Sequence, residues 1–183
     1  MYYRVITPAV LMPIDATFVK AKLRMTHTAL DSDITSLIAA AMSQANDFTG
    51  RQLNAATLMA CSPILTDGIY QIEKGPVNSI AKVEYVKNDG TKVEILDEQY
   101  YVIIRELDSY VVINTDFIFV DPNLSRSDAI QITYSAVFTT FPDEIKNAVA
   151  LMVGRMLMNP EDGVDEKVSI SDNLLRKFRC AIV

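Results

Sequence analysis

The sequence predicts an α+β protein, with an α-helical body of two N-terminal and two C-terminal helices and an inserted antiparallel β-sheet or small β-sandwich. Apolar residues recur with a helical period near both ends of the 183-residue chain, and the period changes to two from about residue 58 to residue 134. Turn-forming residues separate the short apolar runs of this middle part. We therefore assign residues 1–57 and 141–183 to one helical body and residues 58–140 to an inserted β domain.

Two helices are predicted before the β region. The first is short and begins at Asp15, whose side chain is suited to cap a helix N-terminus. The second runs from Asp33 to Phe48, and Asp31-Ser32-Asp33 supply capping groups and negative charge at its start. Gly50 follows it, as glycine commonly does at a helix end. The apolar positions of the second helix fall on one helical face: Ile34, Leu37, Ile38, Ala41, Met42, Ala45 and Phe48.

This second helix also has small residues around its sides, such as Ala39, Ala40 and Ser43. Small side chains let neighbouring elements approach closely, so the helix is suited to packing within a monomer or between subunits. The candidate residues for a contact between subunits are Leu37, Ala41, Met42 and Ala45.

The middle of the chain predicts short strands joined by short connections, which indicates antiparallel pairing. Asn88-Asp89-Gly90 predicts a hairpin turn between two of these strands. The predicted strands are residues 69–72, 80–86, 92–96, 100–104, 109–113, 117–120 and 129–134.

Two further helices are predicted after the β region. Pro142 suits the first turn of the longer one, and Asn159-Pro160 ends it. A polar loop follows over residues 161–168, and Ser171 or Asp172 then caps a last short helix. The apolar stripe of the longer helix consists of Ile145, Ala148, Val149, Met152, Val153, Met156 and Leu157.

A basic cluster, Arg176, Lys177 and Arg179 around Phe178, lies at the end of the last helix. Cations are stabilised at a helix C-terminus, which accounts for the cluster without any partner. The same residues would also suit docking onto an acidic neighbour, with Phe178 as an anchor. We therefore take all four as candidate partner-docking residues.

The composition excludes several classes of function. The net charge is −6, and residues 61–140 carry twelve acidic against six basic groups, so no basic stripe is available to bind a phosphate backbone. No apolar run approaches the ~20 residues of a membrane span, and no signal peptide is recognised at the N-terminus. Half of the residues are apolar, which suggests burial between subunits.

No pattern of catalytic or metal-binding residues is recognised, so we expect no enzyme activity, no metal and no cofactor. His27 has no metal-ligand partner nearby in the sequence, and Cys61 and Cys180 are read as reduced thiols. The acidic residues of 161–168 do not match a calcium loop and are read as a solvated segment. Two alternatives remain: a monomeric β-sandwich-type binding module with helical flanks, and a hydrolase using Glu98, Glu106 and Asp108.

The order of short motifs along the chain resembles the head–tail connector, or neck adaptor, proteins of tailed bacteriophages, in their longer form with a β insertion. Phe178 in place of the usual tyrosine departs from the family pattern, as does Ser135 with no glycine in the turn before Pro142. The motifs are Phe18-Val19-Lys20-Ala21-Lys22-Leu23-Arg24, Asp31-Ser32-Asp33, the alanine-rich helix ending in Thr49-Gly50-Arg51, Gly75-Pro76-Val77-Asn78-Ser79-Ile80, Tyr134-Ser135-Ala136 and Leu174-Leu175-Arg176-Lys177-Phe178-Arg179.

The resemblance implies a non-enzymatic ring, commonly of twelve subunits, that docks beneath the portal protein and extends the DNA channel. It implies a portal protein and a stopper or tail-completion protein as partners, with genomic DNA passing through without sequence-specific binding. It also implies a place in the virion neck, after assembly in the host cytoplasm, and no contact with a membrane.

Overall fold

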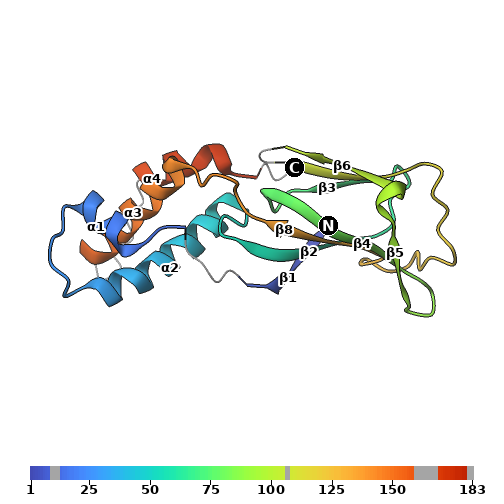
Figure 1. Cartoon of the computed structure of the whole chain (residues 1–183), viewed down its shortest axis with the longest axis horizontal. Coiled ribbons are helices and arrows are strands. Elements are labelled where there is room, and N and C mark those ends of the chain that lie inside the picture. Colours follow the sequence, from blue (N-terminus) through green and yellow to red (C-terminus); the bar gives the residue numbers. More distant parts are fainter. Residues whose placement is uncertain (9–12, 106–107, 159–168, 181–183) are drawn as a thin grey trace. The chain divides into compact units, whose positions relative to one another are not determined.

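The computed structural model describes residues 1–8, 13–105, 108–158 and 169–180 (Figure 1). The chain forms two compact units, and we describe each by itself. The β unit contains residues 1–10 and 55–138, and the helical unit contains residues 11–54 and 139–183. The described residues form four α-helices and two antiparallel sheets, which confirms the α+β class.

The β unit contains a five-stranded sheet with the order β1-β2-β8-β4-β5 and a three-stranded sheet with the order β3-β7-β6. Every ladder is antiparallel, as expected for strands joined by short connections. A short 3₁₀ helix, η1 (Asp97–Gln99), precedes β6. The strands are β1 (Tyr2–Thr7), β2 (Ala56–Ser62), β3 (Ile69–Ile72), β4 (Val77–Val86), β5 (Lys92–Ile95), β6 (Tyr100–Ile104), β7 (Ser109–Ile113) and β8 (Ile130–Ala136).

Both sheets contribute side chains to one buried cluster, so the β unit is a small sandwich. Leu58 and Ile132 come from the larger sheet, and Tyr70 and Val111 come from the smaller one. Each fully buried aliphatic side chain of such a core contributes about 1.5–3 kcal/mol. Tyr134 is buried, but its hydroxyl keeps a hydrogen-bond partner because it donates to the Lys74 carbonyl oxygen at 2.8 Å.

Three features of the β unit differ from the sequence prediction. Strand β1 was not predicted because it is a mostly exposed edge strand, and its residues lie in the β unit rather than in the helical body. Strand β2 was not predicted because nearly all of its residues are buried, so the alternation of period two is lost. Residues 117–120 do alternate, but they form no ladder and lie in a loop.

The helical unit contains the two N-terminal and two C-terminal helices that the sequence predicts. They are α1 (Ala16–Leu23), α2 (Asp31–Thr49), α3 (Asp143–Met158) and α4 (Ile170–Leu175), which continues into the 3₁₀ turn η2 (Arg176–Phe178). Asp15 caps α1 as predicted, because its Oδ1 accepts from the Phe18 N–H at 2.8 Å. Gly50 ends α2 as predicted, in the left-handed conformation with φ at 70°.

Two of the predicted caps are wrong. The helix α2 begins at Asp31, so Asp31 and Asp33 lie in its first turn, and Leu30 precedes it without a side-chain cap. The cap of α4 is Ser169, whose hydroxyl oxygen accepts from the Asp172 N–H at 3.2 Å. Asp172 accepts in return from the Ser169 N–H, which makes a capping box. The predicted stop at residues 159–160 and the predicted loop at 161–168 lie outside the described residues.

The core of the helical unit forms where the apolar stripes of α2 and α3 meet. Ala41 and Met42 of α2 and Val149 and Val153 of α3 are all buried. Gly154 permits the close approach of α1, since a Cβ atom at this position would lie 2.7 Å from Leu23 Cδ2. The predicted amphipathic helices therefore pack first within their own unit.

Replacing Ala41 by glutamate should place a carboxylate in this core and destabilise the helical unit. We expect a loss of about 3 kcal/mol or more, because an unpaired buried charge has no solvation. Ala40→Glu is the matched control, because Ala40 is exposed on the same turn of α2. Urea unfolding followed by circular dichroism compares the two variants, and equal unfolding midpoints would show that Ala41 does not lie in a core.

Candidate interaction surfaces

The C-terminal turn of the chain is held against the end of α2. Arg51 is only 3% exposed, and its Nε donates to the Phe178 carbonyl oxygen at 2.6 Å. Beside it, the Cys180 N–H donates to the Thr49 carbonyl oxygen at 2.7 Å. We name this arrangement of Thr49, Gly50, Arg51, Phe178 and Cys180 the C-terminal anchor. It joins the N-terminal segment of the helical unit, residues 11–54, to its C-terminal segment, residues 139–183.

Each residue of the Thr49-Gly50-Arg51 motif has a different structural role in the C-terminal anchor. Thr49 is buried, and its hydroxyl is satisfied by donating to the Ala45 carbonyl oxygen at 2.7 Å. Gly50 adopts a positive φ, and a Cβ atom there would lie 3.4 Å from the Cys180 Cβ. The Arg51 guanidinium supplies a charged donor to a buried carbonyl, which is a strong hydrogen bond.

The predicted docking residues at the C-terminus do not share one environment. Phe178 is buried in the helical unit, so its side chain is a core residue rather than an exposed anchor for a partner. Arg176, Lys177 and Arg179 are exposed. The Lys177 ammonium binds the carboxylate of Glu144 on α3, and this hydrogen bond lowers the pKa of that carboxyl. The docking role of the three basic residues stays a prediction.

Arg179 has a second contact within its own unit. Its guanidinium lies over the Phe48 ring at 5.7 Å from the ring centroid. A cation–π contact at an exposed site is worth about 0.5–1 kcal/mol. The contact favours one orientation of Arg179, and its charge stays accessible at the surface.

The four predicted subunit-contact residues of α2 lie mainly inside the helical unit. Ala41, Met42 and Ala45 are buried in its core, and Leu37 is half-buried. The surface that α2 presents outward includes small exposed residues such as Ala39, Ala40 and Ser43. A contact between subunits through α2 stays a prediction, and it would have to use this outer face.

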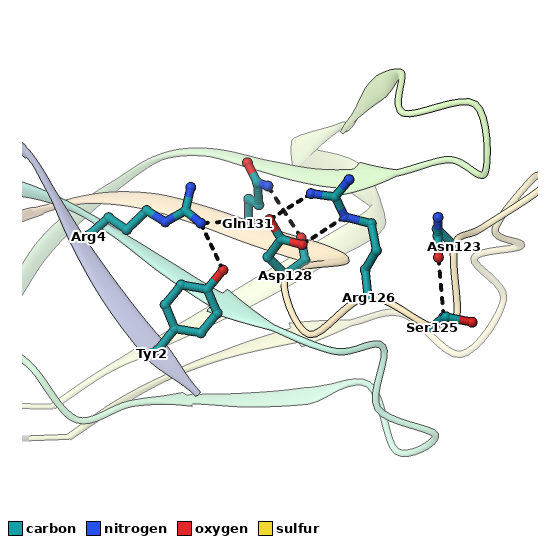
Figure 2. Close-up of polar contacts among 7 residues, drawn as sticks. All are labelled: Tyr2, Arg4, Asn123, Ser125, Arg126, Asp128 and Gln131. Carbon is teal, nitrogen blue, oxygen red and sulfur yellow. Dashed lines mark hydrogen bonds and ion pairs between the residues drawn. The ribbon is translucent and has the colours of Figure 1, made fainter.

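In the β unit, a polar network joins strand β1 to the segment before β8 (Figure 2). Arg126 donates to both oxygens of Asp128, from Nε at 2.7 Å and from Nη2 at 2.9 Å. Arg4 on β1 lies 4.0 Å from the same carboxylate and donates to the Tyr2 hydroxyl at 3.1 Å. Gln131 on β8 donates to the Asp128 carbonyl oxygen at 3.3 Å. The network therefore spans β2, which lies between β1 and β8.

The electrostatics of this network favour a fixed ion pair. The hydrogen bonds from Arg126 lower the pKa of the Asp128 carboxyl, so that it is ionised well below neutral pH. Cys61 lies opposite Tyr2 in the ladder between β1 and β2 and is buried. Burial raises the pKa of its thiol, which is therefore protonated and unreactive at neutral pH. Neither Cys61 nor Cys180 forms a disulfide bond in the structure.

Two carboxylates of the hydrolase alternative, Glu98 and Asp108, lie in different places along the strands of the β unit. Glu98 lies in η1, just before β6, and Asp108 lies just before β7. The pairs Tyr100↔Ile113 and Ile104↔Ser109 mark opposite ends of the β6–β7 ladder, which is about 14 Å long, so the backbones of Glu98 and Asp108 lie near opposite ends of it. Glu106 lies outside the described residues. A pair of acid and base groups at one substrate bond needs a closer approach than this.

Among the residues that the structure describes, no three His, Cys, Asp or Glu side chains gather in a way that would hold a metal ion. None of the described helices is both long and apolar enough to span a membrane. His27 is exposed in the connection between α1 and α2.

Comparison of the sequence with known protein families gives no match. Comparison with curated proteins gives no match either. Solved structures do match over both units: a chain from the virion of a native gene transfer agent particle has a TM-score of 0.80 at 15% identity, and the match covers 100% of this chain and 97% of that one.

Chains from two neck structures of such particles match over the same shares of both chains, again at 15% identity. One is the neck of the empty particle computed with C6 symmetry, with a TM-score of 0.78. The other is the neck of the native particle computed with C12 symmetry, with a TM-score of 0.75. At this identity the similarity establishes a shared fold.

Replacing Arg51 by methionine should release the C-terminal anchor. The substitution keeps an unbranched side chain but removes the donor to the Phe178 carbonyl. We expect this to lower the free energy of opening the C-terminal turn by about 2 kcal/mol. Hydrogen exchange at the Cys180 amide should then be faster by roughly thirtyfold, because 1.4 kcal/mol corresponds to a factor of ten. Arg176→Met, an exposed arginine of the same turn, is the control. If both variants exchange as the unmodified protein does, the anchor does not hold the turn.

Proposed function

We propose that this protein is a structural subunit of the neck of a tailed-phage-like particle. The observation that carries the proposal is the fold match over the whole chain, both units included, with chains from necks of gene transfer agent particles. A shared small sandwich alone would be weak support, because one fold serves many functions. The matched combination of a β-sandwich and a helical unit of four helices, at 97% coverage of the other chain, is a more specific similarity.

The subunits assemble into a closed ring in this proposal. The two neck structures with a similar chain were computed with sixfold and twelvefold symmetry, which supports a ring of twelve copies. Heterologous contacts between identical chains give a ring whenever the rotation closes. Residues 61–140 carry twelve acidic and six basic groups, so DNA passing through the ring would meet little attraction.

The proposed role needs two protein partners and no catalytic activity. One side of the ring binds a portal protein, and the other offers a platform to a stopper or tail-completion protein. Arg176 and Arg179 are the proposed docking charges, because both are exposed on a turn that the C-terminal anchor holds in place. The protein acts in the virion neck, reaches it from the host cytoplasm during assembly, and catalyses no reaction.

Deleting the gene from the phage or prophage that encodes it tests this proposal. We expect heads and tails to accumulate separately, and we expect the unmodified gene to restore complete particles. A gene carrying Arg176→Glu and Arg179→Glu should give roughly tenfold fewer complete particles than the unmodified gene. The purified variant should unfold at nearly the same temperature as the unmodified protein, because exposed charges contribute little to stability.

Arg24→Glu combined with Arg155→Glu is the matched control, since it changes the charge equally at two other exposed arginines of the helical unit. It should restore particle production. Normal particle assembly by the deletion strain would contradict a role in the neck and would favour the monomeric binding module.

A further inference from the structure

The segment from residue 114 to 129 joins β7 to β8 without a strand of its own, yet aromatic packing holds it in place. The Tyr85 ring of β4 packs edge-on against Phe117 and Phe119, with centroids 6.0 and 5.2 Å away. Phe117 and Phe119 also contact each other at 4.9 Å. Figure 1 shows this yellow segment at the end of the β unit where β4 turns into β5.

Hydrogen bonds fix the backbone of the segment as well. The Val120 N–H donates to the Tyr85 hydroxyl oxygen at 3.3 Å. The Asn88 side chain in the β4–β5 turn donates to the Asp121 carboxylate at 2.7 Å, and its backbone N–H donates to the Asp121 carbonyl oxygen at 3.1 Å. The Asn123 N–H donates to the Val86 carbonyl oxygen at 3.0 Å. A long loop that is held at this many points presents its outward side chains in fixed positions.

The outward side chains of this segment are aliphatic. Because Phe117 and Phe119 pack inward, the alternating residues face solvent: Ile118 is 81% exposed and Val120 is 60% exposed. Leu124, further along the segment, is 72% exposed. These side chains add little to the core of the β unit. A rigid apolar surface binds a partner with a small entropic cost, because little ordering remains to be done.

The surface beside Ile118 is acidic. Ile118 and Phe117 border a depression of about 340 Å³ that is open to solvent, and the charged side chains lining it are Glu98 and Asp116. Asn114 also lines it and donates to the Glu98 carbonyl oxygen at 2.9 Å, which ties the two sides of the depression together. Apolar side chains beside two carboxylates are complementary to a partner that presents apolar and basic groups together.

A second copy of the β unit is not a partner that presents apolar and basic groups together. Residues 61–140, which make up most of the β unit, carry an excess of six negative charges, so a second β unit would bring few of the basic groups that complement this surface. We propose that Ile118, Val120 and the depression lined by Glu98 and Asp116 form a docking surface for a protein segment that presents aliphatic side chains flanked by lysine or arginine. This surface lies within the β unit, and the proposal does not depend on ring formation.

A pair of synthetic peptides tests the proposal on the full-length protein. One peptide carries a leucine face flanked by lysines, and the other has glutamate in place of every lysine. Fluorescence anisotropy should show that the lysine peptide binds at least roughly tenfold more tightly, with the difference shrinking as salt screens the charges. Amide chemical shifts should change at residues 114–129 and around Glu98.

Two variants separate the apolar and the acidic parts of the surface. Ile118→Ser with Val120→Ser should weaken binding of the lysine peptide at least roughly tenfold, whereas Glu98→Gln with Asp116→Asn should remove most of the preference for lysine over glutamate. Met158→Ser with Ile170→Ser is the matched control, because these residues are 78% and 71% exposed in the helical unit. It should leave binding unchanged.

Three results would overturn the proposal. They are equal binding of the two peptides, undiminished binding by the Ile118 and Val120 variant, and no binding of either peptide at concentrations up to about 1 mM, where an interaction of about −4 kcal/mol would be detected.

Discussion

The hydrogen bond from Arg51 to the Phe178 carbonyl is the contact that fixes the C-terminal turn of the helical unit. The two residues are 127 positions apart, and the β unit fills most of the chain between them. Closing so long a loop is entropically unfavourable, although the cost grows only slowly with length. Breaking a buried hydrogen bond between a charged donor and a carbonyl is unfavourable, because burial limits how far water can replace it. The bond therefore holds the C-terminal turn to the end of α2.

Several features of the sequence follow from this constraint. The left-handed Gly50 turns the chain so that Arg51 reaches inward, and Thr49 leaves its carbonyl free for Cys180. Phe178 is buried where its carbonyl meets Arg51, so its ring is not available at the surface. What remains outside is charge, namely Arg176 and the neighbouring basic residues. The same anchor thus stabilises the unit and displays its basic surface.

Local patterns in the sequence predicted the parts of the fold that have one buried face. The helices α2 and α3 alternate between buried and exposed residues with a helical period, so their extents were predicted closely. The edge strand β1 and the buried strand β2 lack that contrast, and they were missed. The 117–120 segment shows a strand-like alternation because Tyr85, rather than a neighbouring strand, takes up its inward side chains.

The candidate sites were predicted less well than the fold, because their geometry depends on distant residues. Arg51 was recognised only as part of a motif, since nothing near it in the sequence identifies Phe178 as its partner. Asp128 was not singled out although Arg126 is only two residues away, because Arg4 reaches it only when β1 joins the sheet. The burial of Ala41 and Met42 shows the same limit, since an amphipathic stripe does not distinguish a core from a subunit contact.

The most direct test of the account is the symmetry of the assembled protein in electron micrographs, recorded for the purified chain alone and mixed with its portal protein. The account predicts closed rings, with averages of twelvefold symmetry at least when portal is present. A chain that stays monomeric at all concentrations and does not join the portal would contradict it, and so would open filaments.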